Sequence, residues 1–131
     1  MTGEITVLYL DGDDTQLDLY ARTASDGPEP IVPTTTTDVS IARTRLQSGT
    51  VDCLVTEQKL GSTTGVAFAE SLRADGYDLP IVLHSWEVPE SVLAGDERAV
   101  DAVVTKRTAP QGYRYLHRTV TQVLDSEPPT A

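Results

Sequence analysis

The stretch ITVLYLDGDD, residues 5–14, joins a near-continuous apolar run to a cluster of aspartates. An apolar run of this kind is typical of a strand that is buried on both faces of a sheet. The residues that follow carry the i, i+3, i+4, i+7 spacing of one helix face, at Leu17, Tyr20, Ala21 and Ala24. The chain is therefore predicted to begin with a strand, a polar turn and a helix.

The same alternation continues along the chain. Further apolar runs occur at residues 53–55, 81–83 and 102–104, with a shorter and weaker one at residues 30–33. Helical patterns lie between and after them, at Val39, Ala42 and Leu46, at Val66, Ala69 and Leu72, over about residues 89–94, and from Tyr113 to Leu124. Five such units predict an α/β fold, a doubly wound five-stranded parallel sheet with right-handed crossovers and helices on both faces.

Two segments are predicted to lie outside this regular structure. Residues 34–37 are four threonines, and we expect them to form the loop before the second helix, with Thr37 or Asp38 as its N-cap. Residues 125–131 contain two prolines that cannot continue a helix. We therefore predict one domain over residues 1–124 and a disordered tail or linker after it.

Length and charge limit the classes of function. The chain has 131 residues, the size of one domain, and its 20 Asp and Glu against 10 Lys and Arg give a formal net charge of -10. This charge makes the phosphate backbone of a nucleic acid an unfavourable partner. No apolar run approaches the roughly 20 residues that span a bilayer, and no secretory signal is recognisable. We expect a cytoplasmic protein without a nucleic-acid or membrane partner.

Polar side chains follow four of the predicted strands. Asp11 and Asp13 follow the first strand, Glu57 the third, Ser85 the fourth and Lys106 the fifth. In a doubly wound sheet, ligands bind outside the carboxyl ends of the strands, so these side chains are predicted to meet in one pocket. Carboxylates there are ligands for a hard cation, and a hydroxyl and an ammonium can hold phosphoryl oxygens.

Over residues 5–124 the chain resembles the receiver domains of two-component response regulators, particularly those of haloarchaeal signalling proteins. The resemblance rests on residues 7–11, 51–57, 80–85 and 101–106, and on Gly65 at the start of the third helix. It implies a flavodoxin-like fold with strand order 2-1-3-4-5. It also implies Mg²⁺ as the cofactor and a histidine kinase, or an output domain in the same chain, as the partner, with a dimer through the face of helix 4, strand 5 and helix 5.

Matched by position, Asp11 is the first metal-binding acid of this family, and Glu57 stands where the family has its phosphoacceptor aspartate. Ser85 and Lys106 match the hydroxyl and the lysine that grip the phosphoryl oxygens. A receiver that is phosphorylated at some efficiency is one reading of this match.

The departures from the family pattern favour a different reading. Gly12 stands at the second acid position and cannot coordinate Mg²⁺, so Asp11, Asp13 and Glu57 are predicted to be a poor metal site. The extra methylene of Glu57 displaces its carboxylate by a bond length of roughly 1.5 Å. A misplacement of about 1 Å can cost on the order of a hundredfold in rate. We therefore expect negligible acyl-phosphate formation and a non-enzymatic pseudo-receiver.

Trp86 and Val103 replace a small residue and the aromatic switch of the family, so the usual switching residues are missing. Two interpretations of Glu57 stay open. In the first, the carboxylate partly mimics a phosphate, and its ion pair with Lys106 fixes the domain in one conformation. In the second, the ion pair only neutralises two buried charges. Trp86 and Tyr113 are candidate interface anchors, with core packing as the alternative.

An enzyme of the haloacid dehalogenase class is the competing interpretation. Asp11 and Asp13 after an apolar strand match the first motif of these phosphatases, and Asp96 with Asp101 resembles their metal-binding acid pair. The order of the motifs opposes this reading, because the acid pair of that family follows the lysine, whereas here it precedes Lys106. His84 and His117 lack a third ligand pattern, so we expect them to pack or to lie at the surface.

The scarcity of lysine suggests a habitat. Lys59 and Lys106 are the only lysines in a chain of charge -10. Salt at about 1 M shortens the Debye length to roughly 3 Å and screens the self-repulsion of such a surface. We therefore expect a halophilic source.

This expectation predicts that salt stabilises the fold. Raising KCl from about 0.1 M to about 2 M should raise the midpoint of thermal unfolding, because the repulsion among the acids is screened. Circular dichroism on samples dialysed into each salt concentration measures the effect. A fold that is retained in dilute buffer with an unchanged midpoint would indicate an acidic protein that is not adapted to salt.

Overall fold

The computed structural model describes residues 3–95, 97–106 and 111–125. The side chains of Leu93, Gln111 and Gly112 also lie outside the described part. The tail was predicted at residues 125–131, but Asp125 is the last residue of the final helix. Residues 126–131, and Asp96 of the phosphatase interpretation, fall outside the described ranges, so the predictions for them stay untested.

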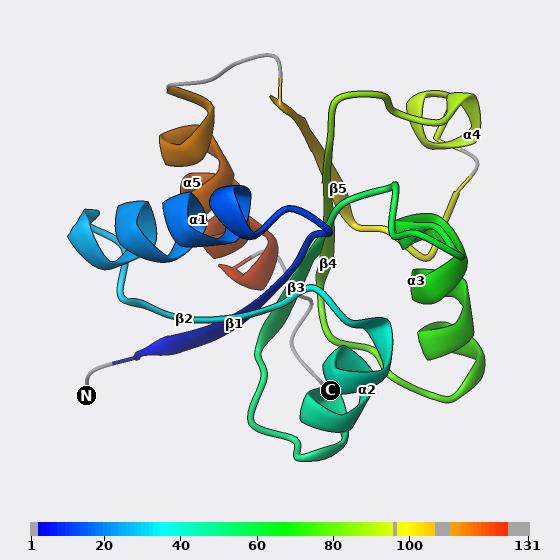
Figure 1. Ribbon diagram of the computed structural model, residues 1–131, viewed down its shortest axis with the longest axis horizontal. Coiled ribbons are helices and arrows are strands. Elements are labelled where there is room, and N and C mark those ends of the chain that lie inside the picture. The colour runs from blue at the N-terminus through cyan, green and yellow to red at the C-terminus, as the bar shows by residue number, and fades with distance from the viewer. Residues whose placement is uncertain (1–2, 96, 107–110, 126–131) are drawn as a thin grey trace.

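A parallel sheet of five strands forms the middle layer (Figure 1). The strands are β1 (Ile5–Leu10), β2 (Ile31–Thr36), β3 (Cys53–Thr56), β4 (Ile81–Ser85) and β5 (Ala102–Thr105). Their order is β2-β1-β3-β4-β5, and every neighbouring pair is parallel. The predicted α/β class and the order 2-1-3-4-5 are confirmed.

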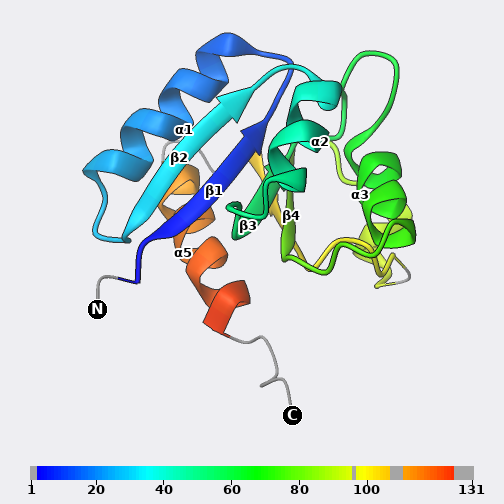
Figure 2. The same cartoon turned by 90° about the horizontal axis from the view of Figure 1, so that it is seen from below.

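Helices cover both faces of this sheet. They are α1 (Asp14–Asp26), α2 (Val39–Gln47), α3 (Gly65–Ala74), α4 (Glu90–Leu93) and α5 (Gln111–Asp125). Figure 2 shows α1 and α5 on one side of the strands, and α2 and α3 on the other. None of the described helices is long and apolar enough to cross a membrane.

The two apolar layers explain the unbroken apolar sequence of β1. Val7 and Tyr9 point into the core beneath α1 and α5, while Leu8 and Leu10 point into the core beneath α2 and α3. Successive residues of a strand face opposite sides, so a strand that is covered on both sides needs apolar residues throughout.

The prediction of a loop at residues 34–37 was wrong for the first three threonines, which belong to β2. Threonine is β-branched and suits a strand, and Thr36 pairs in register with Leu10 of β1. Arg45 of α2 supports this end of β2 by donating hydrogen bonds to Thr34 Oγ1 at 2.6 Å and Thr35 O at 2.8 Å. Of the two expected N-caps, Asp38 is the one used, accepting from the backbone N–H of the second and third residues of α2.

Gly65 opens α3 directly against the end of β3. Its N–H donates to Gln58 O at 2.9 Å, which ties the helix to the loop that follows Glu57. A Cβ at this position would collide with the backbone carbonyl of Glu57 and lie 3.1 Å from Leu83 Cδ1. Only a residue without a side chain allows this approach, and it helps to hold Glu57 at the edge of the sheet.

We predict that Gly65→Ala lowers the free energy of unfolding by about 1–3 kcal/mol, the usual cost of overpacking. Chemical denaturation of both proteins measures this difference. Gly12→Ala is the matched control, because a Cβ at Gly12 meets nothing within 4 Å. An equal effect of the two substitutions would contradict the close approach of Gly65 to Glu57.

Candidate functional site

The carboxyl edge of the sheet brings together three charged side chains from three strand ends. Lys106 Nζ lies 2.7 Å from Asp11 Oδ2 and 2.5 Å from Glu57 Oε2. The three residues are 5%, 3% and 8% exposed, respectively. The ion pair that was predicted between Glu57 and Lys106 is present, and Asp11 joins it on the same ammonium.

Backbone hydrogen bonds extend the sheet by one residue and fix the two acids. The N–H of Asp11 donates to Thr36 O at 3.3 Å, and the N–H of Glu57 donates to Leu10 O at 2.9 Å. Each carboxylate then uses its second oxygen locally. Asp11 Oδ1 accepts from the N–H of Asp13 at 2.9 Å, and Glu57 Oε1 accepts from the N–H of Gln58 at 2.6 Å.

The charges of the cluster stabilise one another. Burial alone would raise the pKa of Glu57, but hydrogen bonds from Lys106, Ser85 and the Gln58 N–H bring that pKa below its ordinary value. Burial alone would lower the pKa of Lys106, but Asp11 and Glu57 raise it. The ammonium and the Glu57 carboxylate therefore both stay ionised at neutral pH.

Ser85 reaches the cluster as predicted, whereas Asp13 does not. The Ser85 hydroxyl hydrogen-bonds Glu57 and is 3% exposed. Asp13 is exposed and serves as the N-cap of α1, where its Oδ1 accepts from the N–H of Thr15 at 2.9 Å. The expectation that Asp13 lies in the pocket therefore gives way to the capping role, and Gly12 next to it is exposed as well.

These residues fit Mg²⁺ poorly. The ammonium of Lys106 already bridges an oxygen of each buried carboxylate, so a metal ion would have to displace it from both. Among the described residues, no group of three or more His, Cys, Asp or Glu side chains could hold a metal ion. The poor affinity for Mg²⁺ that Gly12 predicts stays a prediction.

Tyr20 and His84 extend the cluster, a role that their positions in the sequence do not indicate. The Tyr20 hydroxyl donates to Asp11 Oδ2 at 3.2 Å and lies 2.9 Å from His84 Nδ1. Burial, and the nearby charge of Lys106, lower the pKa of His84 to about 3, so its ring is neutral. Because Tyr20 has one hydroxyl hydrogen and gives it to Asp11, we infer that His84 Nδ1–H donates to Tyr20.

Tyr20 also belongs to a cluster of rings between the sheet and the helices α1 and α5. Its ring stacks on Tyr9 with centroids 5.2 Å apart and meets the edge of Tyr113 at 5.7 Å. The Tyr9 hydroxyl lies 3.1 Å from Nδ1 of His117, which is 2% exposed. His84 and His117 therefore pack inside the protein and do not lie at its surface, which was the other expectation.

The two candidate interface anchors differ. Trp86 is 54% exposed beside Ser85, and with Glu57 it lines a small cavity of about 140 Å³. Tyr113 is only half-buried, but its hydroxyl donates to Gln16 Oε1 at 3.0 Å and its ring packs on Tyr20. Tyr113 thus takes the alternative role in packing, and Trp86 keeps the exposure that an anchor needs.

Asp101 lies at the opposite edge of the sheet from the cluster. It precedes β5, and its Oδ2 accepts from Arg73 Nη2 at 2.9 Å and from the N–H of Ile81, the first residue of β4, at 2.8 Å. An acid that is held at the amino ends of the strands cannot assist Asp11 at their carboxyl ends. This position opposes the phosphatase interpretation.

Solved structures of receiver domains share this fold. The receiver domain of the Francisella response regulator 1452 matches with a TM-score of 0.80 and 18% identity over 93% of this chain and 98% of that chain. A Thermotoga maritima response regulator in complex with Mg²⁺ and BeF gives 0.75 and 17% over 91% and 98%. The response regulator domain of Thermotoga maritima CheB gives 0.78 and 13% over 95% and 99%.

The sequence itself matches no protein-family model, and no curated protein matches it. At these identities the likeness to solved structures establishes the receiver fold, and the function has to be argued from the site.

We predict that Lys106→Ala lowers the free energy of unfolding by about 3–5 kcal/mol at pH 7, because it leaves two buried carboxylates unpaired. Lys59→Ala is the matched control, since Lys59 is exposed, and its effect should stay within about 0.5 kcal/mol. Urea unfolding of the three proteins measures both effects.

The same comparison has a defined pH dependence. Pairing lowers the pKa of Glu57, so its stabilisation is present above the ordinary value of 4.5 and is lost as the pH falls through the lowered folded-state pKa. The difference between wild type and Lys106→Ala should therefore shrink as the pH falls toward and below 4.5, because Glu57, buried and unpaired in the variant, takes up a proton. A constant difference from pH 7 to pH 3 would show that the loss comes from packing.

Proposed function

We propose that this protein is an atypical receiver module that transmits signals through protein contacts, with Glu57 in place of a phosphorylated aspartate. The single observation that carries the proposal is the Lys106 ammonium, 2.5 Å from Glu57 Oε2 at the carboxyl edge of a receiver fold. In a phosphorylated receiver, a lysine and a hydroxyl grip the phosphoryl oxygens. Here Lys106 and Ser85 hold the carboxylate of Glu57 instead.

The contacts of Glu57 oppose its use as a nucleophile. One oxygen accepts from Gln58 N–H and the other is paired with Lys106, so attack on a phosphoryl donor would first have to break a buried ion pair. The carboxylate carries a charge of -1, whereas a phosphate carries about -1.5 to -2. The proposed mimicry of a phosphoryl group is therefore partial, and it needs no bound metal.

The partner class follows from the receiver fold. The proposed partners are signalling proteins such as a histidine kinase, or an output domain in the same chain. The protein acts on them by binding and does not catalyse a reaction. The face of α4, β5 and α5 is the proposed contact and dimer surface, and exposed Trp86 lies just before α4. A cytoplasmic location and a salt-rich habitat complete the proposal.

Acetyl phosphate with Mg²⁺ tests the proposal against a receiver that is phosphorylated at low efficiency. We expect no phosphoryl mass adduct on the wild type, because the nucleophile is displaced and paired. The double variant Glu57→Asp with Gly12→Asp restores the acceptor and the metal ligand and should form the adduct. An adduct on the wild type would overturn the proposal.

Hydrolysis of a phosphate ester by the wild type and by Asp11→Asn tests the phosphatase interpretation. The wild type should not hydrolyse p-nitrophenyl phosphate, and Asp11→Asn should leave that result unchanged. Turnover that Asp11→Asn abolishes would establish the enzyme and overturn the pseudo-receiver. Circular dichroism of each variant confirms that the fold is intact before the results are compared.

A further inference from the structure

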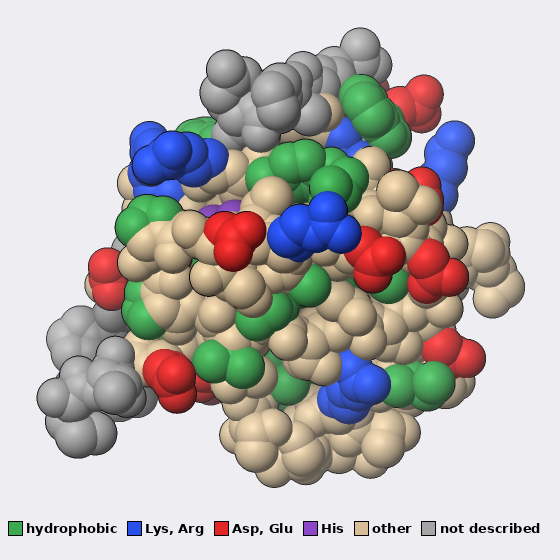
Figure 3. All heavy atoms as spheres, turned by 60° about the vertical axis from the view of Figure 1, so that its left-hand side comes forward, with side chains coloured by type: hydrophobic (Ala, Val, Ile, Leu, Met, Phe, Trp, Pro, Cys, Tyr) green, Lys and Arg blue, Asp and Glu red, His purple; other side chains and the backbone are tan. Residues whose placement is uncertain are grey.

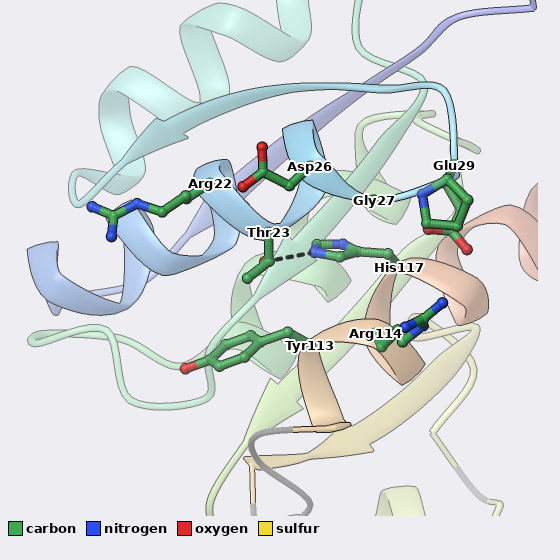
Figure 4. A pocket seen from close by; sticks show the side chains of 9 residues that line it. Arg22, Thr23, Asp26, Gly27, Glu29, Tyr113, Arg114 and His117 are labelled. Carbon is green, nitrogen blue, oxygen red and sulfur yellow. Dashed lines mark hydrogen bonds between the residues drawn. The ribbon is translucent and has the colours of Figure 1, made fainter.

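A pocket of about 350 Å³ lies between α1 and α5, on the side of the sheet away from α2 and α3. Figure 4 shows the ring of His117 between the two helices, with Tyr113 below it and with Glu29 and Arg114 toward one end. Figure 3 shows this side of the molecule, where a histidine is visible in a hollow that is flanked by acidic and basic side chains. The proposed receiver function does not use this pocket.

The inner wall of the pocket is hydrogen-bonded and neutral at Thr23 and His117. Thr23 Oγ1 donates to Leu19 O at 2.7 Å, so it accepts from His117 Nε2, 3.0 Å away. Nδ1 of His117 is then the acceptor for the Tyr9 hydroxyl at 3.1 Å. Burial lowers the pKa of His117 to about 4, against the opposing charge of Glu29. A ligand would therefore find both ring nitrogens of His117 already engaged in hydrogen bonds.

Two arginines and two acids line the pocket, namely Arg22, Arg114, Asp26 and Glu29, and the end where Glu29 and Arg114 lie has one charge of each sign. Glu29 and Arg114 both line it, and neither forms an ion pair with another side chain in the described part of the chain. Arg43 and Arg73, by contrast, are both committed to ion pairs with aspartates. A ligand that carries both a carboxylate and an ammonium could pair with Arg114 and Glu29, while an anion alone would face Glu29.

The pocket also connects to the buried ion cluster. Tyr113, which lines the pocket, packs on Tyr20 at 5.7 Å and on His84 at 6.4 Å between ring centroids. His117 reaches Tyr20 through the stacked ring of Tyr9. Tyr20 donates to Asp11, which in turn binds Lys106. One layer of rings thus separates the pocket from the charged cluster.

We propose that the pocket between α1 and α5 binds a small zwitterion of the amino-acid class, and that its occupancy is transmitted through Tyr20 to Asp11 and Lys106. Arg114 binds the carboxylate, Glu29 binds the ammonium, and an apolar side chain lies against Tyr113 and His117. The binding step stands apart from the proposed function, whereas the coupling would make that function responsive to a ligand.

L-phenylalanine is the probe for the site, and isothermal titration calorimetry measures its binding. We expect saturable binding, at least about tenfold weaker for 3-phenylpropionate and for 2-phenylethylamine, each of which lacks one charge. Arg114→Ala and Glu29→Gln should each weaken binding by a similar factor. Arg118→Ala, an exposed arginine one turn further along α5, should not. Absent binding, or equal binding of a singly charged analogue, would overturn the ligand class.

Trp86 is the chain's single tryptophan and lines the small cavity beside Glu57, outside the α1–α5 pocket, so its fluorescence reports the coupling. Saturating L-phenylalanine should shift the emission of the wild type and leave that of Tyr20→Phe unchanged, although this variant still binds. Where Tyr20→Phe does not fold, the ¹⁵N signal of the Lys106 ammonium in the wild type replaces it, with exposed Lys59 as internal control.

If L-phenylalanine binds but changes neither the Trp86 emission nor, where it is the readout, the ¹⁵N signal of Lys106, the proposed coupling is overturned. The proposed binding site then still stands. A phosphoryl adduct formed from acetyl phosphate would overturn the pseudo-receiver proposal but not the proposed binding site or its coupling to Lys106. The failure of each proposal is therefore distinguishable.

Discussion

Lys106 carries a full positive charge where 5% of its surface is exposed, and an unpaired ion in such a place costs several kcal/mol. Asp11 and Glu57 supply the opposite charge, but they stand at the ends of β1 and β3, while Lys106 follows β5. Neighbouring strands lie roughly 4.8 Å apart, so Glu57 and Lys106 meet across the end of β4, and Asp11 meets Lys106 across the ends of β3 and β4. Glu57 and Lys106 stand at the ends of the two strands that flank β4, and each spans the gap with a long side chain, while Asp11 contacts the same ammonium from β1.

The constraint extends into the backbone. The acids can meet the ammonium only where β1 and β3 end level with each other, and the pairing of Leu10 with Thr56 sets that register. Gly65 then lets α3 approach the carbonyl of Glu57, and Asp13 caps α1 next to Asp11. Features outside the ion cluster, namely the strand register, Gly65 and the cap of α1, thus keep the charged groups in contact.

The sequence was sufficient for the architecture and for most of the cluster. Apolar runs and helical spacing predicted the sheet, because burial on two faces imposes a pattern that needs no knowledge of partners. Asp11, Glu57, Ser85 and Lys106 were found because strand ends of a parallel sheet converge. Tyr20 was missed because its place on the apolar face of α1 is equally consistent with core packing, and the spacing says nothing about where a hydroxyl points. The threonines of β2 were missed because an edge strand is less apolar than a central one.

The outer edge of β2 has a consequence for how copies of this protein can meet. Ile5 N–H donates to Pro30 O and Asp11 N–H donates to Thr36 O, so the odd-numbered residues of β2 turn their backbone groups away from β1. Pro33 has no N–H to offer there, and Arg45 already occupies the carbonyl of Thr35. A foreign strand would find neither a donor at Pro33 nor a free acceptor at Thr35, so edge-to-edge aggregation is discouraged. Association on this side is left to side chains, which can be selective in a way that strand addition is not.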